Sequence, residues 1–129
     1  NGKEVGIMFQ EPRLFAQLTN LENVMLVIKQ KQEKLQKATI LLEAFGVLDA
    51  ANKYPEELSG GMAKRVSLAR AIAFDSDILL LDEPFSALDI ETKNSVISKT
   101  KNLLQGKTVV FVTHDAAEAE LFADCIIHL

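Results

Sequence analysis

Asp77-Ile78-Leu79-Leu80-Leu81-Asp82-Glu83-Pro84 is the stretch that decides the fold. Its four consecutive aliphatic residues are too few for a helix and lack polar alternation, so they predict a strand buried on both faces of a parallel sheet. Pro84 has no N–H with which to continue the hydrogen-bond ladder, so the strand ends before it. Because ligands of open α/β sheets bind at the carboxyl ends of the strands, Asp82 and Glu83 are expected to lie where chemistry is done. Taken alone, the pattern would also fit a buried strand that ends in a solvated acidic turn.

The composition indicates a globular chain without a basic surface. Its 129 residues suffice for one domain with a sizeable core, and 48% of them are hydrophobic. A net charge of −4 argues against nucleic acid as a partner of the whole domain. The single cysteine, Cys125, lies in an apolar run and is expected to be a small buried residue. No apolar run reaches the roughly 20 residues of a membrane span, and the first residues lack a signal-peptide pattern. We therefore expect a cytosolic protein that reaches a membrane only by docking on another protein.

Strand and helix patterns alternate along the chain. A short strand is expected at residues 5–9, followed by a polar loop and a helix capped by Thr19 or Asn20. Alternation of this kind predicts an α/β fold with a parallel sheet, and the long helical stretch after the first strand predicts an inserted helical subdomain. The further predicted elements are a helix with an apolar stripe (Leu35, Ala38, Leu41, Leu42 and Phe45) that ends at Gly46, a helix from Ser59 to about Phe74, the strand 78–82, a helix at about 90–104 that ends at Gly106, a strand at 108–113, a short helix at about 116–123 and a last strand at 125–129.

Five short motifs occur in an order that is characteristic of one family. They are Gln10, Leu58-Ser59-Gly60-Gly61-Met62, Asp82-Glu83, Ser86-Ala87-Leu88-Asp89 and His114. In this order they resemble the Q-loop, signature, Walker B strand, D-loop and H-loop of the nucleotide-binding domain of ABC transporters. The resemblance implies a P-loop NTPase-like (RecA-like) fold with a mostly parallel sheet. It also implies a helical signature subdomain at about 14–75, with 1–13 and 76–129 in the catalytic core.

The resemblance implies a role for each matched residue, with ATP and Mg²⁺ as cofactors. Asp82 and Gln10 would hold Mg²⁺, Glu83 would orient or deprotonate the attacking water, and His114 would contact the γ-phosphate. The other matched residues are expected to bind nucleotide or the dimer partner, with Ser59, Gly60 and Gly61 clamping the γ-phosphate held by the opposite subunit and Asp89 crossing the dimer interface. Glycines suit that task because they lack a Cβ and let phosphate approach the backbone N–H groups of a helix start. An ordinary Ser N-cap followed by two turn glycines would give the same local pattern.

The phosphate-binding P-loop pattern, Gly-x-x-x-x-Gly-Lys-Ser/Thr, does not occur. Gly106-Lys107-Thr108 carries its last three residues, but Lys101 stands where the first glycine belongs, and the triplet follows a helix instead of a strand. We expect the P-loop to lie before Asn1 and the 129 residues alone neither to bind ATP tightly nor to hydrolyse it. Family topology also places an absent strand between 109–113 and 125–129, so a gap or rearrangement is expected there.

The leading functional hypothesis is the ATPase subunit of a membrane transporter, and the loop after Gln10 favours an importer. Its expected partners are a second ATPase subunit in a head-to-tail dimer and transmembrane permease subunits, which would hold it on the inner face of the cell membrane. DNA-repair ATPases share the motifs but separate them by a long coiled coil, whereas Gln10 and Ser59 are 49 positions apart. A two-domain translation factor and a non-catalytic remnant remain as alternatives.

Overall fold

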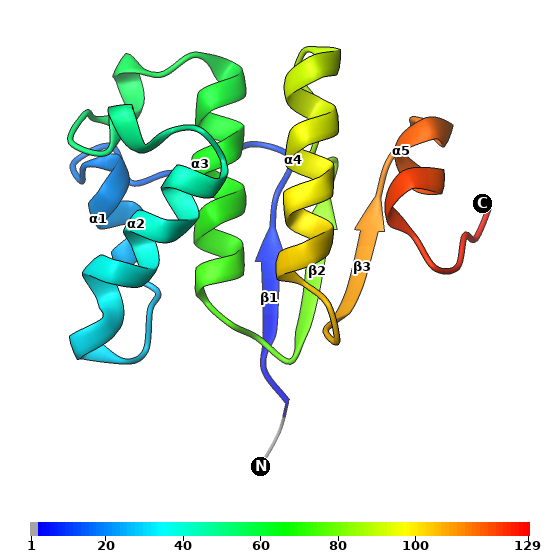
Figure 1. Cartoon of the computed structure of the whole chain (residues 1–129), viewed down its shortest axis with the longest axis horizontal. Coiled ribbons are helices and arrows are strands. Elements are labelled where there is room, and N and C mark those ends of the chain that lie inside the picture. The colour runs from blue at the N-terminus through cyan, green and yellow to red at the C-terminus, as the bar shows by residue number, and fades with distance from the viewer. Residues whose placement is uncertain (1–2) are drawn as a thin grey trace.

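The computed structural model describes residues 3–129, in which three strands form one parallel sheet. The strands are β1 (Val5–Met8), β2 (Ile78–Asp82) and β3 (Thr108–Val112), and their order across the sheet is β1-β2-β3. Both neighbouring pairs are parallel, so the carboxyl ends of all three strands meet at one edge (Figure 1). The predicted parallel α/β architecture is therefore confirmed.

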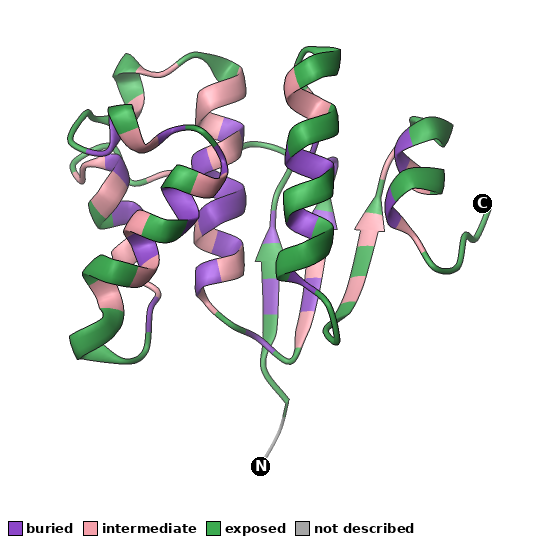
Figure 2. Cartoon of the chain, viewed as in Figure 1, coloured by how far each residue is buried: buried purple, intermediate pink, exposed green. Residues whose placement is uncertain are grey.

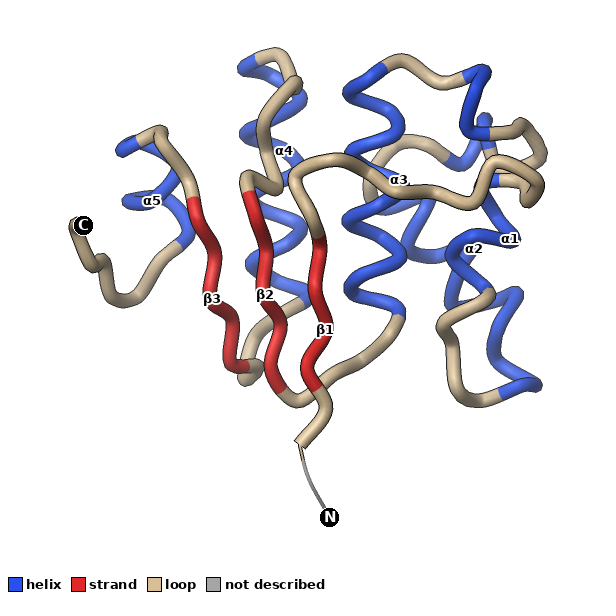
Figure 3. The backbone as a smooth tube through the Cα atoms, turned by 180° about the vertical axis from the view of Figure 1, so that it is seen from behind, coloured by secondary structure: helices blue, strands red, loops and turns tan. Residues whose placement is uncertain are grey.

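The helices lie beside the sheet and over one of its faces (Figures 1 and 3). Helix α3 packs against β1 and also against α1 and α2, so it joins the helical stretch to the sheet. The division into a subdomain at about 14–75 and a core at 1–13 and 76–129 stays a prediction. The helices are α1 (Asn20–Met25), α2 (Lys34–Ala44), α3 (Gly60–Ala73), α4 (Ile90–Leu103) and α5 (Ala116–Phe122), with short 3₁₀ turns at Lys31–Glu33, Leu48–Ala50 and Pro55–Glu57.

The sheet is buried on one face only within the described residues, so the prediction of strands buried on both faces was wrong. Leu79 and Leu81 of β2 point into the core and are at most 3% exposed. On the other face, Ile7 of β1 and Val110 of β3 are 51% and 54% exposed. The reason is visible in Figure 3, where the strands lie in front and the helices lie behind them. Figure 2 shows the same contrast, with purple buried residues along α3 and green exposed residues along β1 and β3.

The core lies between the sheet and the helices. Three phenylalanines join the loop after β2, strand β3 and α5, because Phe85 packs edge-to-face against Phe111 and Phe122, with ring centroids 6.4 and 5.6 Å away. Phe85 itself has no exposed surface. Edge-to-face pairs of this kind add about 0.5–1.5 kcal/mol to the stabilisation from area burial. This cluster fixes the polar residues that follow β2 and β3 relative to each other.

The helix ends follow the predicted capping chemistry. Thr19 and Glu22 form a capping box at the start of α1, with Glu22 N–H donating to Thr19 Oγ1 and Thr19 N–H donating to Glu22 Oε1. The pKa of the Glu22 carboxyl is lowered by hydrogen bonds that it accepts from Thr19, chiefly from the backbone N–H. Gly46 and Gly106 adopt the left-handed conformation, with φ of 71° and 80°, after α2 and α4.

Three local predictions were wrong. Residues 125–129 form no strand and make no ladder with β3, because no neighbouring strand is present among the described residues to receive them. For the same reason Cys125 is exposed instead of buried. Leu35 lies in the first turn of α2 and is 59% exposed, so the buried stripe of that helix begins at Ala38.

Candidate functional site

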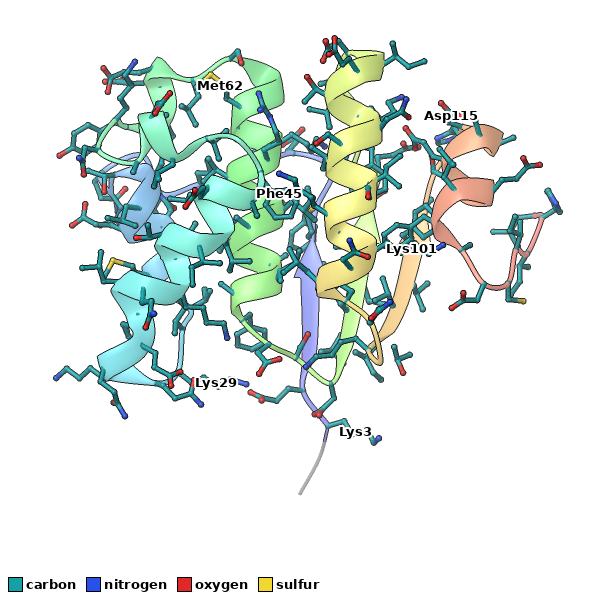
Figure 4. The ribbon with its side chains drawn as sticks, in the orientation of Figure 1. Lys3, Lys29, Phe45, Met62, Lys101 and Asp115 are labelled. Carbon is teal, nitrogen blue, oxygen red and sulfur yellow. The ribbon has the colours of Figure 1, made fainter. Side chains whose placement is uncertain are left out.

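The polar residues that follow the three strands meet at one edge of the sheet. Gln10 follows β1, Asp82 and Glu83 end β2, and His114 follows β3. Gln10 and Asp82 are exposed and line the same cleft, together with Gly60 at the start of α3. Figure 4 shows Met62 and Asp115 at this end of the molecule and Lys3 and Lys29 at the opposite end. The structure therefore brings most of the residues predicted from the motifs to one edge.

Glu83 and His114 are in direct contact across β2 and β3. Glu83 Oε1 accepts a hydrogen bond from the backbone N–H of His114 at 3.0 Å and also contacts His114 Nδ1. Glu83 is 8% exposed, whereas the side chain of His114 is 92% exposed. With the ring proton on Nδ1, the imidazole donates to the carboxylate and Nε2 is left for another group. The pair thus combines a buried carboxylate with an exposed imidazole.

The backbone of Glu83 is held in an unusual conformation. Its φ is 49°, which costs a non-glycine residue about 1–2 kcal/mol. The conformation persists because Glu83 N–H donates to Val112 O at 2.8 Å and Ser86 Oγ donates to Glu83 O at 3.1 Å. These bonds turn the chain away from β2 and set the carboxylate under the end of β3. Such strain is characteristic of functional sites.

The segment after His114 is fixed by a second group of polar side chains. Asp115 caps α5 by accepting from the backbone N–H groups of Glu118 and Ala117, and these bonds are the main cause of its lowered pKa. Buried Glu118 accepts from Thr113 Oγ1 at 2.5 Å and pairs with Lys93 of α4 at 2.9 Å. The hydrogen bond that Lys93 donates to the Glu118 carboxylate raises the pKa of Lys93. His114 therefore lies between Thr113 and Asp115, whose side chains are both held by hydrogen bonds to α5.

The two signature glycines have different surroundings. Ser59 Oγ accepts from Met62 N–H at 3.2 Å, which is the predicted N-cap of α3. A Cβ on Gly60 would meet no atom within 4 Å, so this backbone is open to a ligand. A Cβ on Gly61 would lie 3.1 Å from Ala87 O. The missing side chain of Gly61 therefore leaves room for the close approach of the loop after β2 to α3, a reason that the motif alone did not indicate.

Asp89 is not part of this cluster. It is exposed at the start of α4, where its backbone carbonyl accepts from Lys93 N–H at 2.8 Å and its side chain makes no capping bond. Its predicted role at a dimer interface needs a second subunit and stays a prediction.

Lys64 is the residue of this edge that the motifs did not identify. It is only 4% exposed, and its ammonium donates to Gln10 O and to Glu83 O, the second at 3.2 Å. Burial lowers its pKa, while the nearby charges of Glu83 and Asp82 act in the opposite direction. A signal was present in the sequence, because Lys64 shares a helix face with Ser67, Leu68 and Ala71, all of which are buried.

The residues present fit the Mg²⁺ end of a bound nucleotide. A carboxylate and an amide, as in Asp82 and Gln10, supply the oxygen ligands that Mg²⁺ prefers. No group of three or more His, Cys, Asp or Glu residues within 3–129 could hold a metal ion by itself. Mg²⁺ usually takes one or two protein carboxylates and completes its shell with water and substrate phosphates.

Known proteins that resemble the chain are ATP-binding proteins of ABC transporters. A probable amino-acid ABC transporter ATP-binding protein of Haemophilus influenzae is 46% identical over 127 residues, which cover 94% of this chain and 49% of that protein. The glutamine transport ATP-binding protein GlnQ of Escherichia coli is 41% identical, with 98% and 55% covered. A dimeric structure of the ATP-binding cassette MJ0796 bound to ADP and Pi superposes with a TM-score of 0.83 at 36% identity, covering 93% of this chain and 56% of that one.

The chain spans about half the length of the curated relatives that it matches. No helix within residues 3–129 has both the length and the apolar character that crossing a membrane requires. The family model described as "ABC transporter" matches residues 1–86. Together with the shared fold, this match shows that the chain belongs to the ABC transporter family, as part of its ATP-binding domain.

Proposed function

We propose that the chain belongs to the ATP-hydrolysing subunit of an ABC importer. The observation that carries this proposal is the contact between Glu83 and His114 beside exposed Asp82, at the carboxyl edge of a parallel sheet. A buried carboxylate at that edge can accept a proton from water, and an exposed imidazole can donate a hydrogen bond to a phosphate oxygen.

Each residue at the edge has a proposed task. Asp82 and Gln10 hold Mg²⁺, which when bound neutralises charge on the phosphates. Glu83 orients and deprotonates the attacking water, and its Oε1 keeps the His114 ring in place. Ser59 and Gly60 bind the γ-phosphate held by a second subunit. Two observations support this role: the space around Gly60 is open, and both residues lie at the N-terminal end of α3.

The proposed assembly is a head-to-tail dimer of ATPase subunits docked on permease subunits at the inner face of the membrane. Asp89 would contact the second subunit from the start of α4. Support comes from the dimeric cassette structure and from relatives named for transport of amino acids and import of aliphatic sulfonates. An importer of small solutes is the class that these relatives favour.

We further propose that residues 1–129 alone do not turn over ATP. No Gly-x-x-x-x-Gly-Lys-Ser/Thr pattern occurs in them, so the backbone amides and lysine that hold β- and γ-phosphates are not supplied by this sequence. Mg²⁺-dependent phosphate release by the purified 129-residue chain would contradict this proposal.

The test of the function uses the complete gene product. We expect Mg²⁺-dependent ATPase activity that falls at least about 100-fold in Glu83→Gln, because the amide cannot accept a proton. Glu120→Gln is the matched control, since Glu120 is exposed on α5. Activity of Glu83→Gln equal to that of the control would refute the proposed role of Glu83.

A further inference from the structure

A buried ammonium lies directly beneath the edge that carries the site. Lys64 belongs to α3 and is 4% exposed, which is unusual for a lysine because an unpaired charge is costly to bury. Its neighbours on the same helix face, Ser67 and Leu68, are also buried. The side chain therefore runs inward, and its charge must be satisfied within the protein.

The ammonium is satisfied by two backbone carbonyls from different strand ends. Lys64 Nζ donates to Gln10 O, in the turn after β1, and to Glu83 O, in the turn after β2. These two turns carry the proposed Mg²⁺ ligands and the proposed general base. One atom of α3 thus sets how far apart the two turns lie.

The same helix holds the next part of the loop after β1. Arg70 Nη2 donates to Pro12 O at 2.9 Å, and Arg70 Nη1 donates to Arg13 O at 3.0 Å. The Arg13 guanidinium in turn lies 3.9 Å over the ring of Phe9. The loop from Gln10 to Arg13 is therefore held to α3, the helix capped by Ser59, at three carbonyls.

We propose that Lys64 is a positioning residue for ATP hydrolysis, whose ammonium holds the Gln10 and Glu83 turns at a fixed separation and couples both to the signature end of α3. This inference rests on the proposed function for its kinetic consequence. Lys64 does not contact nucleotide in this role and acts through Gln10 and Glu83. A side chain that only filled space would support folding without affecting the separation of the turns.

Three variants of the complete gene product separate these roles. Lys64→Met keeps the length and loses the donors, Lys64→Gln keeps N–H donors without the charge, and Lys99→Met is the control because Lys99 is exposed on α4. We expect kcat to fall about 10–100-fold in Lys64→Met with KM for ATP nearly unchanged, because misplaced catalytic groups lose rate more than binding. Lys64→Gln should recover part of the loss. A kcat for Lys64→Met within twofold of the control, or equally slow Met and Gln variants, would overturn the inference.

A second measurement does not depend on activity. Hydrogen exchange of the complete gene product should become about tenfold faster in Lys64→Met at the amides of Glu83 and Ser86, which donate to Val112 O and Glu83 O, as expected for losing a charged hydrogen bond. Exchange in α5 and in the Lys99→Met control should stay unchanged. If the wild-type gene product lacked ATPase activity, the proposed function would fail while this comparison still decided the role of Lys64. Unchanged exchange at the amides of Glu83 and Ser86 in Lys64→Met would overturn the inference about Lys64.

Discussion

Gly60 and Gly61 offer a matched pair of substitutions that tests the packing of the signature helix. Both are in the first turn of α3 with ordinary helical backbone, so alanine at either position reduces the freedom of the unfolded chain. That effect alone stabilises a protein by about 0.4–1 kcal/mol. At position 60 no steric contact opposes this stabilisation, since an added Cβ meets no atom within 4 Å.

The outcome differs at position 61 because of the loop after β2. An added Cβ would lie 3.1 Å from Ala87 O and 3.4 Å from Leu88 Cδ2, and the first contact is tighter than an ordinary one. Relief of the contact would require a shift of the Ala87 backbone, which already lies in the left-handed region with a φ of 67°. Overpacking of this kind costs about 1–3 kcal/mol. We therefore expect Gly60→Ala to be more stable than Gly61→Ala by about 1–3 kcal/mol.

Urea unfolding of the 129-residue chain, followed by circular dichroism, measures both free energies of unfolding. Gly60→Ala should exceed the wild type, and Gly61→Ala should fall below Gly60→Ala. Equal stability of the two variants, or a more stable Gly61→Ala, would refute the close approach of α3 to the Ala87 carbonyl.

Three other substitutions test separate parts of the fold. Phe85→Ala removes the centre of the aromatic cluster and should lower the free energy of unfolding by about 3–5 kcal/mol in the same urea assay, so a loss below about 1 kcal/mol would show that the cluster is not packed as described. Ser59→Ala should cost about 1 kcal/mol through loss of the N-cap of α3, and a neutral effect would count against that cap. The hydrogen bond from Lys107 lowers the pKa of Asp75, so its contribution is present above the unfolded value of about 3.9 and is lost as pH falls through the folded value. Asp75→Asn should therefore flatten the stability profile below about pH 4, and an unchanged profile would contradict the ion pair.

The strand and helix pattern was predictable where local chemistry decides it. Four aliphatic residues before Asp82 indicated β2, and Gly46 and Gly106 marked the ends of α2 and α4. The tail from Cys125 was not predictable from its apolar residues, because a strand needs a neighbour to complete its hydrogen bonds. The hydrophobic pattern of a segment indicates which secondary structure it can form, but a strand forms only where a neighbouring strand can pair with it.

The candidate site was predictable from motif order but its geometry was not. Glu83 and His114 are 31 positions apart, and only the parallel pairing of β2 with β3 brings the carboxylate to the His114 backbone. Lys64 was missed because a lysine on a helix is ordinarily solvated. Gly61 was interpreted as a phosphate contact, and the structure shows that its missing Cβ also leaves room for the Ala87 carbonyl.

In the proposed mechanism, Glu83 and His114 act on one phosphate as a single unit. A double-mutant cycle in the complete gene product, with Glu83→Gln, His114→Ala and the combined variant, measures this directly through kcat for ATP hydrolysis. Groups that act as a unit give strongly non-additive losses. We predict that the combined variant is about as slow as the slower single variant. A combined loss equal to the product of the two single losses would contradict the claim.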